Sequence, residues 1–366
     1  GDLLMQKKII ALAVAGLVSG AAFAQSNVTI SGRLDVMLER TTATGGQRSN
    51  KLDSGGLGGS RLTFSGTEVM GGGLKGLFML DLNLNADGNT GALGESAFNG
   101  ITNARNVYVG LSSNLGTLVA GRLNSPGMDA AIKYDAMAAS VFGPVQSFGR
   151  SGVINGGTIQ AAGRVNNAVA YVSPNMGGLT LTGAYSFAGL TGEVVTGGTT
   201  GVAEQESIVG LRADYSVGPM NVGFVHHRID DRGNVAGVDN RENLLGASYN
   251  FGVATLVASY QTGKSNAANR GTDKLWAIGG IIPVGNGDFR VQYAKFNDND
   301  TATAANDASG WGVQYNHNLS KRTTAYAGYQ RIDNKGAGTI RTIMGDATPT
   351  AGGNSTGYGV GLRHMF

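Results

Sequence analysis

The sequence contains no cysteine and very little proline. None of its 366 residues is Cys and only 6 are Pro. The absence of cysteine excludes disulfide scaffolds, cysteine-ligated zinc and cysteine nucleophiles. The scarcity of proline excludes collagen and Pro-rich linkers. The 61 glycines therefore point to tight turns and to strands that bend.

Long apolar runs and a strong net charge are also missing. Beyond the N-terminal segment, no stretch approaches the ~20 apolar residues that a membrane helix needs. The formal net charge of +3 is too balanced to indicate a nucleic-acid partner. The four histidines lack metal-ligand spacing, and no Ser–His–Asp order stands out. We therefore expect no metal, no cofactor and no enzymatic activity.

The N-terminus reads as a secretory signal peptide. Met5–Lys8 is basic, Ile9–Val18 is apolar, and Ala22–Ala24 forms a small-x-small cleavage signal. Residues 1–4 lie upstream of the expected initiator Met5. We expect residues 1–24 to be removed on export and residues 25–366 to form the mature domain.

The mature chain is built from short segments in which apolar and polar residues alternate. In the first, Val28–Glu39, the even positions are mainly apolar and the odd positions mainly polar, so one face is apolar and the other polar. The pattern recurs in about 16 segments, an even number, as single-chain bacterial barrels require. In a soluble sandwich the apolar faces would meet each other, whereas in a membrane barrel they face lipid.

The connectors between these segments alternate between short turns and long loops. Short connectors such as Asn114–Gly116 and Gly285–Gly287 alternate with long ones such as Thr41–Gly59 and Asn334–Ser355. This regular sorting favours the outer-membrane barrel over the sandwich. The last segment places apolar and aromatic residues on one face and ends on an aromatic, as expected of a strand that closes the barrel against the first: Tyr358, Val360, Leu362 and Phe366.

The alternation lapses between Leu123 and Arg164. Connections this long are uncommon in compact domains and are usually functional or disordered. The segment contains Tyr134, Phe142 and Phe148, which argues against disorder. Two interpretations remain open from the pattern alone: a long surface loop, or a segment that folds inward and narrows the barrel.

Several ordered pieces of the chain resemble the Gram-negative general porins, specifically the β-proteobacterial group found in Burkholderiales and Neisseria. Each piece alone is a weak signal, but together they cover nearly the whole mature chain in the family's order. The pieces are Ser60–Glu68, Gly71–Phe78, Val107–Leu111 with Gly121–Arg122, Asn167–Asn175, Ser320–Thr323 with Tyr326, and Val360–Phe366.

The resemblance implies an all-β transmembrane antiparallel barrel of 16 strands in the outer membrane, assembled as a homotrimer. It implies that the third extracellular loop, here within 123–164, folds inside and forms the constriction. The implied partners are outer-membrane lipid and lipopolysaccharide, with the barrel assembly machinery and periplasmic chaperones acting during biogenesis. No cofactor and no nucleic acid are implied.

One departure from the family pattern concerns charge. The tip of this loop often reads Pro-Glu-Phe-Gly in the wider family, but here Pro144–Gly149 contains no acid. We expect a basic wall facing the loop, which would favour anions; its candidate residues are Arg33, Arg61, Lys75 and Arg122. Alternatively, these are lumen charges paired with nearby acids. Only the resemblance implies that Arg122 faces the lumen, because in its own segment Arg122 has the same parity as the apolar residues.

The constriction loop carries four further candidates. Asp129 and Asp135 would form the acidic side of the constriction, or would cap and pin the loop by accepting backbone N–H bonds. The pinning role is favoured for Asp135. Arg150 and Arg164 could line the pore or, as favoured here, anchor the loop to the wall.

The sequence thus predicts a passive diffusion porin for small hydrophilic solutes and ions, with mild anion preference. A non-conducting barrel that acts as an adhesin or structural protein is the main alternative. A barrel enzyme such as a lipase ranks lower, since no converging Ser and His can be identified.

Overall fold

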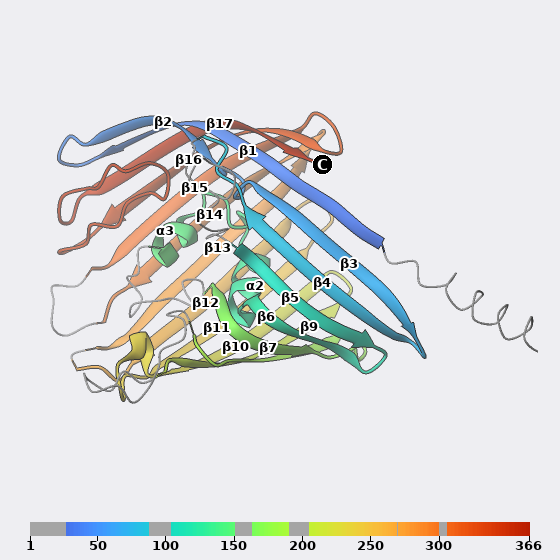
Figure 1. The fold of residues 1–366 in the computed structure, drawn as a ribbon. Coiled ribbons are helices and arrows are strands. Elements are labelled where there is room, and N and C mark those ends of the chain that lie inside the picture. The colour runs from blue at the N-terminus through green and yellow to red at the C-terminus, as the bar shows by residue number, and fades with distance from the viewer. Residues whose placement is uncertain (1–26, 88–103, 151–162, 190–204, 269, 300–305) are drawn as a thin grey trace, which may run out of the picture.

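The computed structural model describes residues 27–87, 104–150, 163–189, 205–268, 270–299 and 306–366. The expected signal peptide, residues 1–24, lies outside this part of the chain. The described residues form one antiparallel sheet of 17 strands, two helices and a short 3₁₀ turn (Figure 1). No helix in the described ranges combines the length and apolarity needed to cross a bilayer.

The elements follow one another in chain order around the wall. The bounds are β1 (Asn27–Ala43), β2 (Arg48–Ser54), β3 (Arg61–Gly71), β4 (Leu74–Asn83), β5 (Ala104–Ser113), β6 (Gly116–Asn124), α2 (Pro126–Lys133), α3 (Pro144–Arg150), β7 (Arg164–Val172), β8 (Leu179–Ser186), β9 (Ser207–Val217), β10 (Met220–Asp230), η2 (Arg232–Asn234), β11 (Asn240–Asn250), β12 (Thr255–Ser265), β13 (Thr272–Val284), β14 (Gly287–Asn297), β15 (Ala308–Asn318), β16 (Thr323–Asn334) and β17 (Asn354–Met365).

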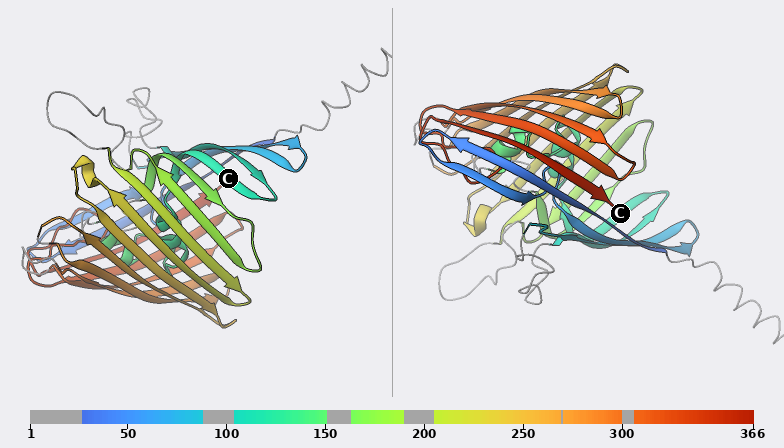
Figure 2. Two further views of the ribbon diagram at one scale, coloured as in Figure 1. Left: turned by 90° about the horizontal axis from the view of Figure 1, so that it is seen from below. Right: turned by 90° about the horizontal axis from the view of Figure 1, so that it is seen from above.

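The sheet closes on itself, which confirms the expected barrel. β17 pairs with β1 from Arg33↔Met365 to Ala43↔Ser355, and backbone hydrogen bonds between Gly32 and Phe366 extend the seam. β1 and β17 therefore leave no free edge where the chain's first and last strands meet, whereas β2 pairs with β1 alone among the described strands. Figure 2 shows the tilted strands wrapping around the two helices.

The wall has 16 strand positions, because β2 and β3 are two halves of one interrupted strand. β1 pairs with β2 through residues 36–42 and with β3 through residues 27–33. The expected long connector Thr41–Gly59 is therefore wrong. The turn spans only a few residues after Ala43, the chain re-enters the sheet at Arg48, and residues 55–60 bulge out of the ladder. Alternation over Arg48–Ser54 is too polar to show this strand.

The two faces of the wall follow the predicted alternation. In β1, Val28, Ile30 and Leu38 are each about 60% exposed, whereas the intervening Asp35 and Met37 are 0% and 1% exposed. Apolar side chains thus cover the outer surface, and polar side chains with the inward segments fill the interior, as in a membrane barrel.

Candidate functional site

The segment between β6 and β7 folds inside the barrel, which decides between the two interpretations of the sequence. α2 contacts β9, β10 and β11, and α3 contacts β14, β15 and β16. Figure 1 shows both helices enclosed by the strands. Residues 125–163 are called loop 3 below, and statements about it refer to its described part, 125–150 and 163.

The first turn of α2 is specified locally. Ser125 is the N-cap, and its hydroxyl oxygen accepts a hydrogen bond from the backbone N–H of Met128 at 3.1 Å. Pro126 occupies the first turn, where a missing N–H costs nothing. Asp129 near the start and Lys133 near the end complement the helix dipole.

Loop 3 lies directly on glycines of the inner wall. A Cβ atom on Gly246 would come within 2.2 Å of the Tyr134 ring, and one on Gly223 within 2.5 Å of its hydroxyl oxygen. A Cβ on Gly328 would lie 2.4 Å from the Phe142 ring. These approaches are shorter than real Cβ contacts, so the close seating of the loop requires glycine at these positions.

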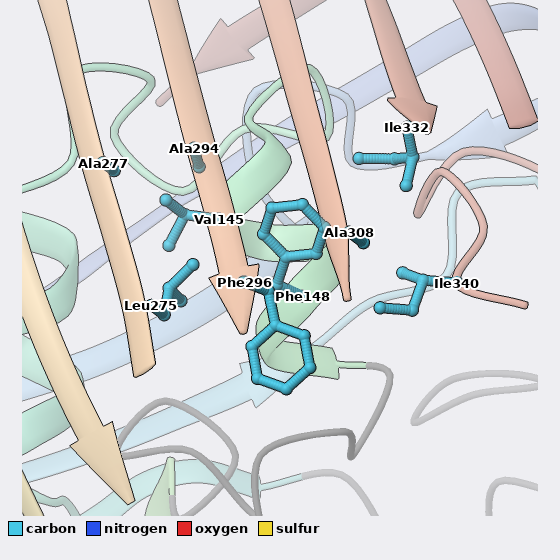
Figure 3. Close-up of a cluster of buried hydrophobic side chains, with 9 residues drawn as sticks. All are labelled: Val145, Phe148, Leu275, Ala277, Ala294, Phe296, Ala308, Ile332 and Ile340. Carbon is cyan, nitrogen blue, oxygen red and sulfur yellow. The ribbon is translucent and has the colours of Figure 1, made fainter. Parts of the chain in front are cut away.

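Aromatic and aliphatic side chains fix the α3 end of loop 3. Val145 and Phe148 are 1% and 0% exposed and pack among wall residues of β13–β16 (Figure 3). The Phe148 and Phe296 rings lie 6.3 Å apart. Nearby, the hydroxyl of Ser147 donates to Gln330 Oε1 at 3.1 Å. Both apolar burial and a polar pin therefore hold α3 to the wall.

Asp135 organises the turn that follows α2. Its carboxylate accepts hydrogen bonds from the backbone N–H groups of Met137 and Ala139, both at 2.9 Å, and from Gln292 Nε2 at 2.6 Å. Gln146 Nε2 lies at 3.4 Å. Burial raises the pKa of Asp135, although these donors oppose the rise. Its contacts are those of a residue that pins the loop.

Tyr134 and Lys133 tie the end of α2 to β9. The Tyr134 hydroxyl donates to Asp214 Oδ1 at 2.7 Å, and Lys133 Nζ lies 2.9 Å from the same oxygen. Arg212 Nε lies 2.5 Å from the other oxygen of Asp214. Burial, with the bond to Asp214, raises the pKa of Tyr134, so its hydroxyl stays protonated and donates.

The start of α2 rests on a buried histidine. His227 Nε2 accepts a hydrogen bond from the backbone N–H of Gly127 at 3.1 Å. Its other ring nitrogen lies 3.5 Å from Glu242 Oε2, and both side chains are almost fully buried. The accepting nitrogen carries no proton, so the proton sits on Nδ1, facing the carboxylate.

A second long connector also folds inward. The expected long connector Asn334–Ser355 contains Ile340, Thr342 and Met344, which are 3%, 0% and 1% exposed. The backbone N–H of Ile343 donates to Ser147 Oγ of α3 at 3.0 Å. Sequence reasoning missed this packing because the segment lacks a regular period.

The bulge at residues 55–60, called the 55–60 bulge below, meets loop 3 from the other side. Asp35 accepts bonds from the backbone N–H groups of Gly56, Leu57 and Gly58 at 3.0–3.2 Å. Tyr326 donates to the same carboxylate at 2.5 Å. The N–H of Val141 in loop 3 donates to the Gly56 carbonyl oxygen at 3.0 Å, which joins loop and bulge.

Four arginines gather on the arc of wall that the two helices do not chiefly contact. Arg33 of β1 lies within electrostatic range of Arg61, Arg105 and Arg363, on β3, β5 and β17. Arg33 Nε donates to the Gly59 carbonyl oxygen at 2.9 Å, so the guanidinium rests on the 55–60 bulge. These four residues are called the arginine cluster below.

Acids neutralise part of the arginine cluster. Asp81 lies 3.1 Å from Arg105 Nε and 3.8 Å from Arg61 Nη1. Asp35 stands opposite Arg363 in the ladder, but its carboxylate is occupied by the 55–60 bulge and Tyr326. Four guanidinium groups against these two acids leave a net positive region.

The other two expected wall residues lie elsewhere. Lys75 is exposed and is the second residue of β4, next to the short turn after Gly71. Arg122 lies at a register shift of β6 where Gly121 has φ +145°, and it donates to the Ala104 carbonyl oxygen at 2.8 Å and to Asn166 Oδ1. Neither interacts with Arg33, so the structure groups only Arg33 and Arg61 of the expected four.

Of the three remaining candidates in residues 123–164, the structure describes the side chains of two, Asp129 and Arg164. Asp129 accepts a hydrogen bond from Asn124 Nδ2 at 2.8 Å and lies within electrostatic range of Arg212 and Arg164. Arg164 begins β7 and pairs with Asn124 in the ladder. The side chain of Arg150 lies outside the part of the chain that the structure describes.

Arg105 and Arg363 are the residues that sequence reasoning missed. Arg363 alternates with Leu362 in the last segment, so parity already placed it on the inner face. Arg105 shares parity with the exposed Val109 and Leu111, and it reaches Asp81 only because the β4–β5 ladder is irregular between Leu80 and Leu82, so alternation alone would have directed it to the outer face. Among the described residues, no group of three metal-ligating side chains exists.

Comparison with known proteins agrees with this architecture. The profile of the Gram-negative porins matches residues 11–337. Outer membrane porin protein 32 of Delftia acidovorans is 34% identical over 99% of this chain and 100% of its own length. An outer membrane porin protein of Bordetella pertussis is 25% identical with the same coverage.

A solved structure gives the same result for the fold. An anion-selective porin from Comamonas acidovorans superposes with a TM-score of 0.79 at 30% identity, over 93% of this chain and 100% of that one. The chain therefore belongs to the Gram-negative porin family. It is an outer-membrane porin of the β-proteobacterial type, a channel and not an enzyme.

Proposed function

We propose that this porin is a general diffusion channel for small hydrophilic solutes and ions with a mild preference for anions. The observation that carries the proposal is the arginine cluster, which stands across from a loop 3 whose buried acid, Asp135, is saturated with donors. Fixed positive charge in a narrow aqueous path compensates the lost hydration of anions and repels cations. The anion-selective relative supports the same sign.

Within this proposal the basic wall consists of Arg33 and Arg61, to which we add Arg105 and Arg363. Lys75 would contribute positive charge at the end of the channel where the short turns lie, since it is next to the turn between β3 and β4. Arg122 would act as a wall residue that holds β6 to its neighbours. Loop 3, within 123–164, forms the constriction, with Arg164 anchoring it.

The path to the membrane is part of the same proposal. Residues 1–24 act as a signal peptide, with residues 1–4 upstream of the start, and residues 25–366 form the barrel. The outward-facing residues of the last strand, which are 44–55% exposed, would engage the assembly machinery and periplasmic chaperones: Tyr358, Val360, Leu362 and Phe366. The mature protein would form homotrimers in contact with lipopolysaccharide; OmpT of Vibrio cholerae, which shares the fold at 13% identity, has a solved trimer form.

Selectivity after charge removal tests the proposal. In Arg33→Gln/Arg61→Gln, the reversal potential under a salt gradient should fall to roughly half of the wild-type value or less, because half of the cluster is neutralised. Lys321→Gln/Arg322→Gln, at an exposed short turn, is the matched control and should retain the wild-type potential.

Two results would contradict the proposal. An unchanged reversal potential in the Arg33/Arg61 variant would remove the cluster from the conduction path. Absence of stepwise conductance from folded wild-type protein would favour a closed barrel with an adhesive or structural role.

A further inference from the structure

Asp35 of β1 binds the 55–60 bulge through every polar group that it has. Its side chain is 0% exposed and accepts hydrogen bonds from three consecutive backbone N–H groups of the bulge and from the Tyr326 hydroxyl. Its backbone N–H donates to Ser60 Oγ at 3.0 Å. Its carbonyl oxygen accepts from the backbone N–H of Gly55 at 2.8 Å and from the Ser60 hydroxyl at 3.1 Å. A single residue therefore holds both ends and the middle of the bulge.

The 55–60 bulge in turn supports one member of the arginine cluster. Arg33 Nε donates to the Gly59 carbonyl oxygen at 2.9 Å. A Cβ on Gly58 would lie 2.9 Å from Arg33 Cζ and closer still to Nη2, so the guanidinium rests directly on the bulge. The position of the Arg33 charge thus depends on the bulge, and the shape of the bulge depends on Asp35.

The 55–60 bulge also holds loop 3. The backbone N–H of Val141 donates to the Gly56 carbonyl oxygen at 3.0 Å. A Cβ on Gly56 would lie 2.7 Å from the Tyr326 ring, and the Phe142 ring of loop 3 meets the same tyrosine edge to face at 6.2 Å. The contacts that fix Arg33 and those that fix this part of loop 3 therefore meet at one short segment.

We propose that Asp35 is a positioning residue for ion selectivity, which acts through the 55–60 bulge on both Arg33 and loop 3. The inference rests on the proposed anion preference and deepens it. The fully buried carboxylate need not meet the ions, because the bulge and Arg33 carry its effect to the channel. A carboxylate suits this role because both of its oxygens accept hydrogen bonds, whereas an amide would offer one acceptor and would turn its own N–H groups toward the bulge.

Reversal potential and single-channel conductance separate positioning from a direct effect of charge. If Asp35 acted by its charge alone, Asp35→Asn would raise the anion preference, because an acid within electrostatic range of Arg33 and Arg363 is lost. Positioning predicts the reverse. The bulge loosens, Arg33 leaves its place and loop 3 retreats, so the anion-to-cation permeability ratio should fall by about twofold or more while conductance rises.

Asp81→Asn is the matched control for the loss of an acid. Asp81 lies 3.1 Å from Arg105 Nε and 3.8 Å from Arg61 Nη1, and its hydrogen-bonding and ion-pair partners lie on β3 and β5. This variant should raise the anion preference at the wild-type conductance, because it removes negative charge and leaves the bulge in place.

Gly58→Ala tests the same contact without changing any charge. The added methyl group displaces the Arg33 guanidinium, so the anion preference should fall, while the bond from loop 3 to Gly56 remains and conductance stays near that of wild type. Gly183→Ala, whose Cβ meets only Leu211 Cδ2 at an ordinary 3.8 Å, should match wild type in both measurements. Folding is checked by the heat-dependent shift on a denaturing gel, and Gly58→Ala decides the matter if Asp35→Asn does not fold.

A rise in anion preference in Asp35→Asn, with the same sign as in Asp81→Asn, would overturn the positioning role and leave the proposed function intact, since fixed charge would still govern the ions. A wild-type reversal potential in Gly58→Ala would overturn it as well. If neither aspartate variant nor Arg33→Gln/Arg61→Gln changes the potential, the arginine cluster lies off the conduction path, and the proposed function fails together with the inference.

Discussion

Replacing one glycine beneath loop 3 should open the channel without damaging the barrel. A Cβ on Gly246 would lie 2.2 Å from Tyr134 Cγ, 2.4 Å from Cδ2 and 2.6 Å from Cβ. Because the clash reaches Cβ of Tyr134, rotation of the ring cannot relieve it. In Gly246→Val, therefore, Tyr134 and the end of α2 have to move off the wall.

The energetic cost can be bounded from these contacts. Overpacking costs about 1–3 kcal/mol. Loss of the 2.7 Å bond from Tyr134 to the Asp214 carboxylate adds about 1.5–3 kcal/mol. Together these amount to about 3–6 kcal/mol against the docked loop, or roughly 10² to 10⁴ in the docking equilibrium. Valine favours strands, so the wall itself should keep its stability.

Single-channel conductance and limited proteolysis measure the outcome. Gly246→Val should conduct more than wild type and should be cut within loop 3. Gly280→Val is the matched control, because a Cβ there meets only Val291 Cγ1, at an ordinary 3.8 Å. If Gly246→Val and Gly280→Val have the same conductance and the same cleavage pattern, the close contact between Gly246 and Tyr134 is not what holds loop 3 against the wall.

Three further predictions concern loop 3. Phe142→Ala should loosen the loop by about 3–5 kcal/mol, because a fully buried ring is lost; proteolysis would show faster cleavage than in wild type, and equal rates would contradict this. His227→Ala leaves the Gly127 N–H without its acceptor and should cost about 1–3 kcal/mol, seen as a lower melting temperature. The pKa of Asp135 is raised in the docked loop, so its contribution to docking is complete below the ordinary aspartate pKa and is lost as pH rises through the raised value. Protection of the loop should therefore decline with rising pH in wild type and less so in Asp135→Asn, and identical pH profiles would refute that role.

The barrel could be predicted from the sequence because period-2 alternation and loop sorting are local signals. In Val28–Leu38 the alternation within the segment alone identifies the face toward lipid, and the neighbouring strands need not be known. The pattern of residues 123–164 does not decide whether the segment folds inward, because the wall glycines that receive the loop, such as Gly246 and Gly328, are distant in sequence. The missing side chains of these glycines matter only once strand pairing has built the wall against which loop 3 packs.

The site was predicted less completely, for reasons of register. Arg33 and Arg61 were placed together because each lies on the polar face of an alternating segment. Arg122 follows a register shift at Gly121, so the alternation of the sequence does not predict which face its side chain occupies. Lys75 shares the parity of the inner face, but it lies at the short-turn end of the barrel. Height along the barrel depends on strand pairing, which alternation alone does not encode.

The reversal potential of the wild-type protein in a planar bilayer under a salt gradient tests the central claim most directly. The arginine cluster facing a loop 3 without a free described acid predicts stepwise conductance with an anion-selective sign. A cation-selective sign would contradict the account, because the net positive region around Arg33 and Arg61 could not then govern the path of the ions.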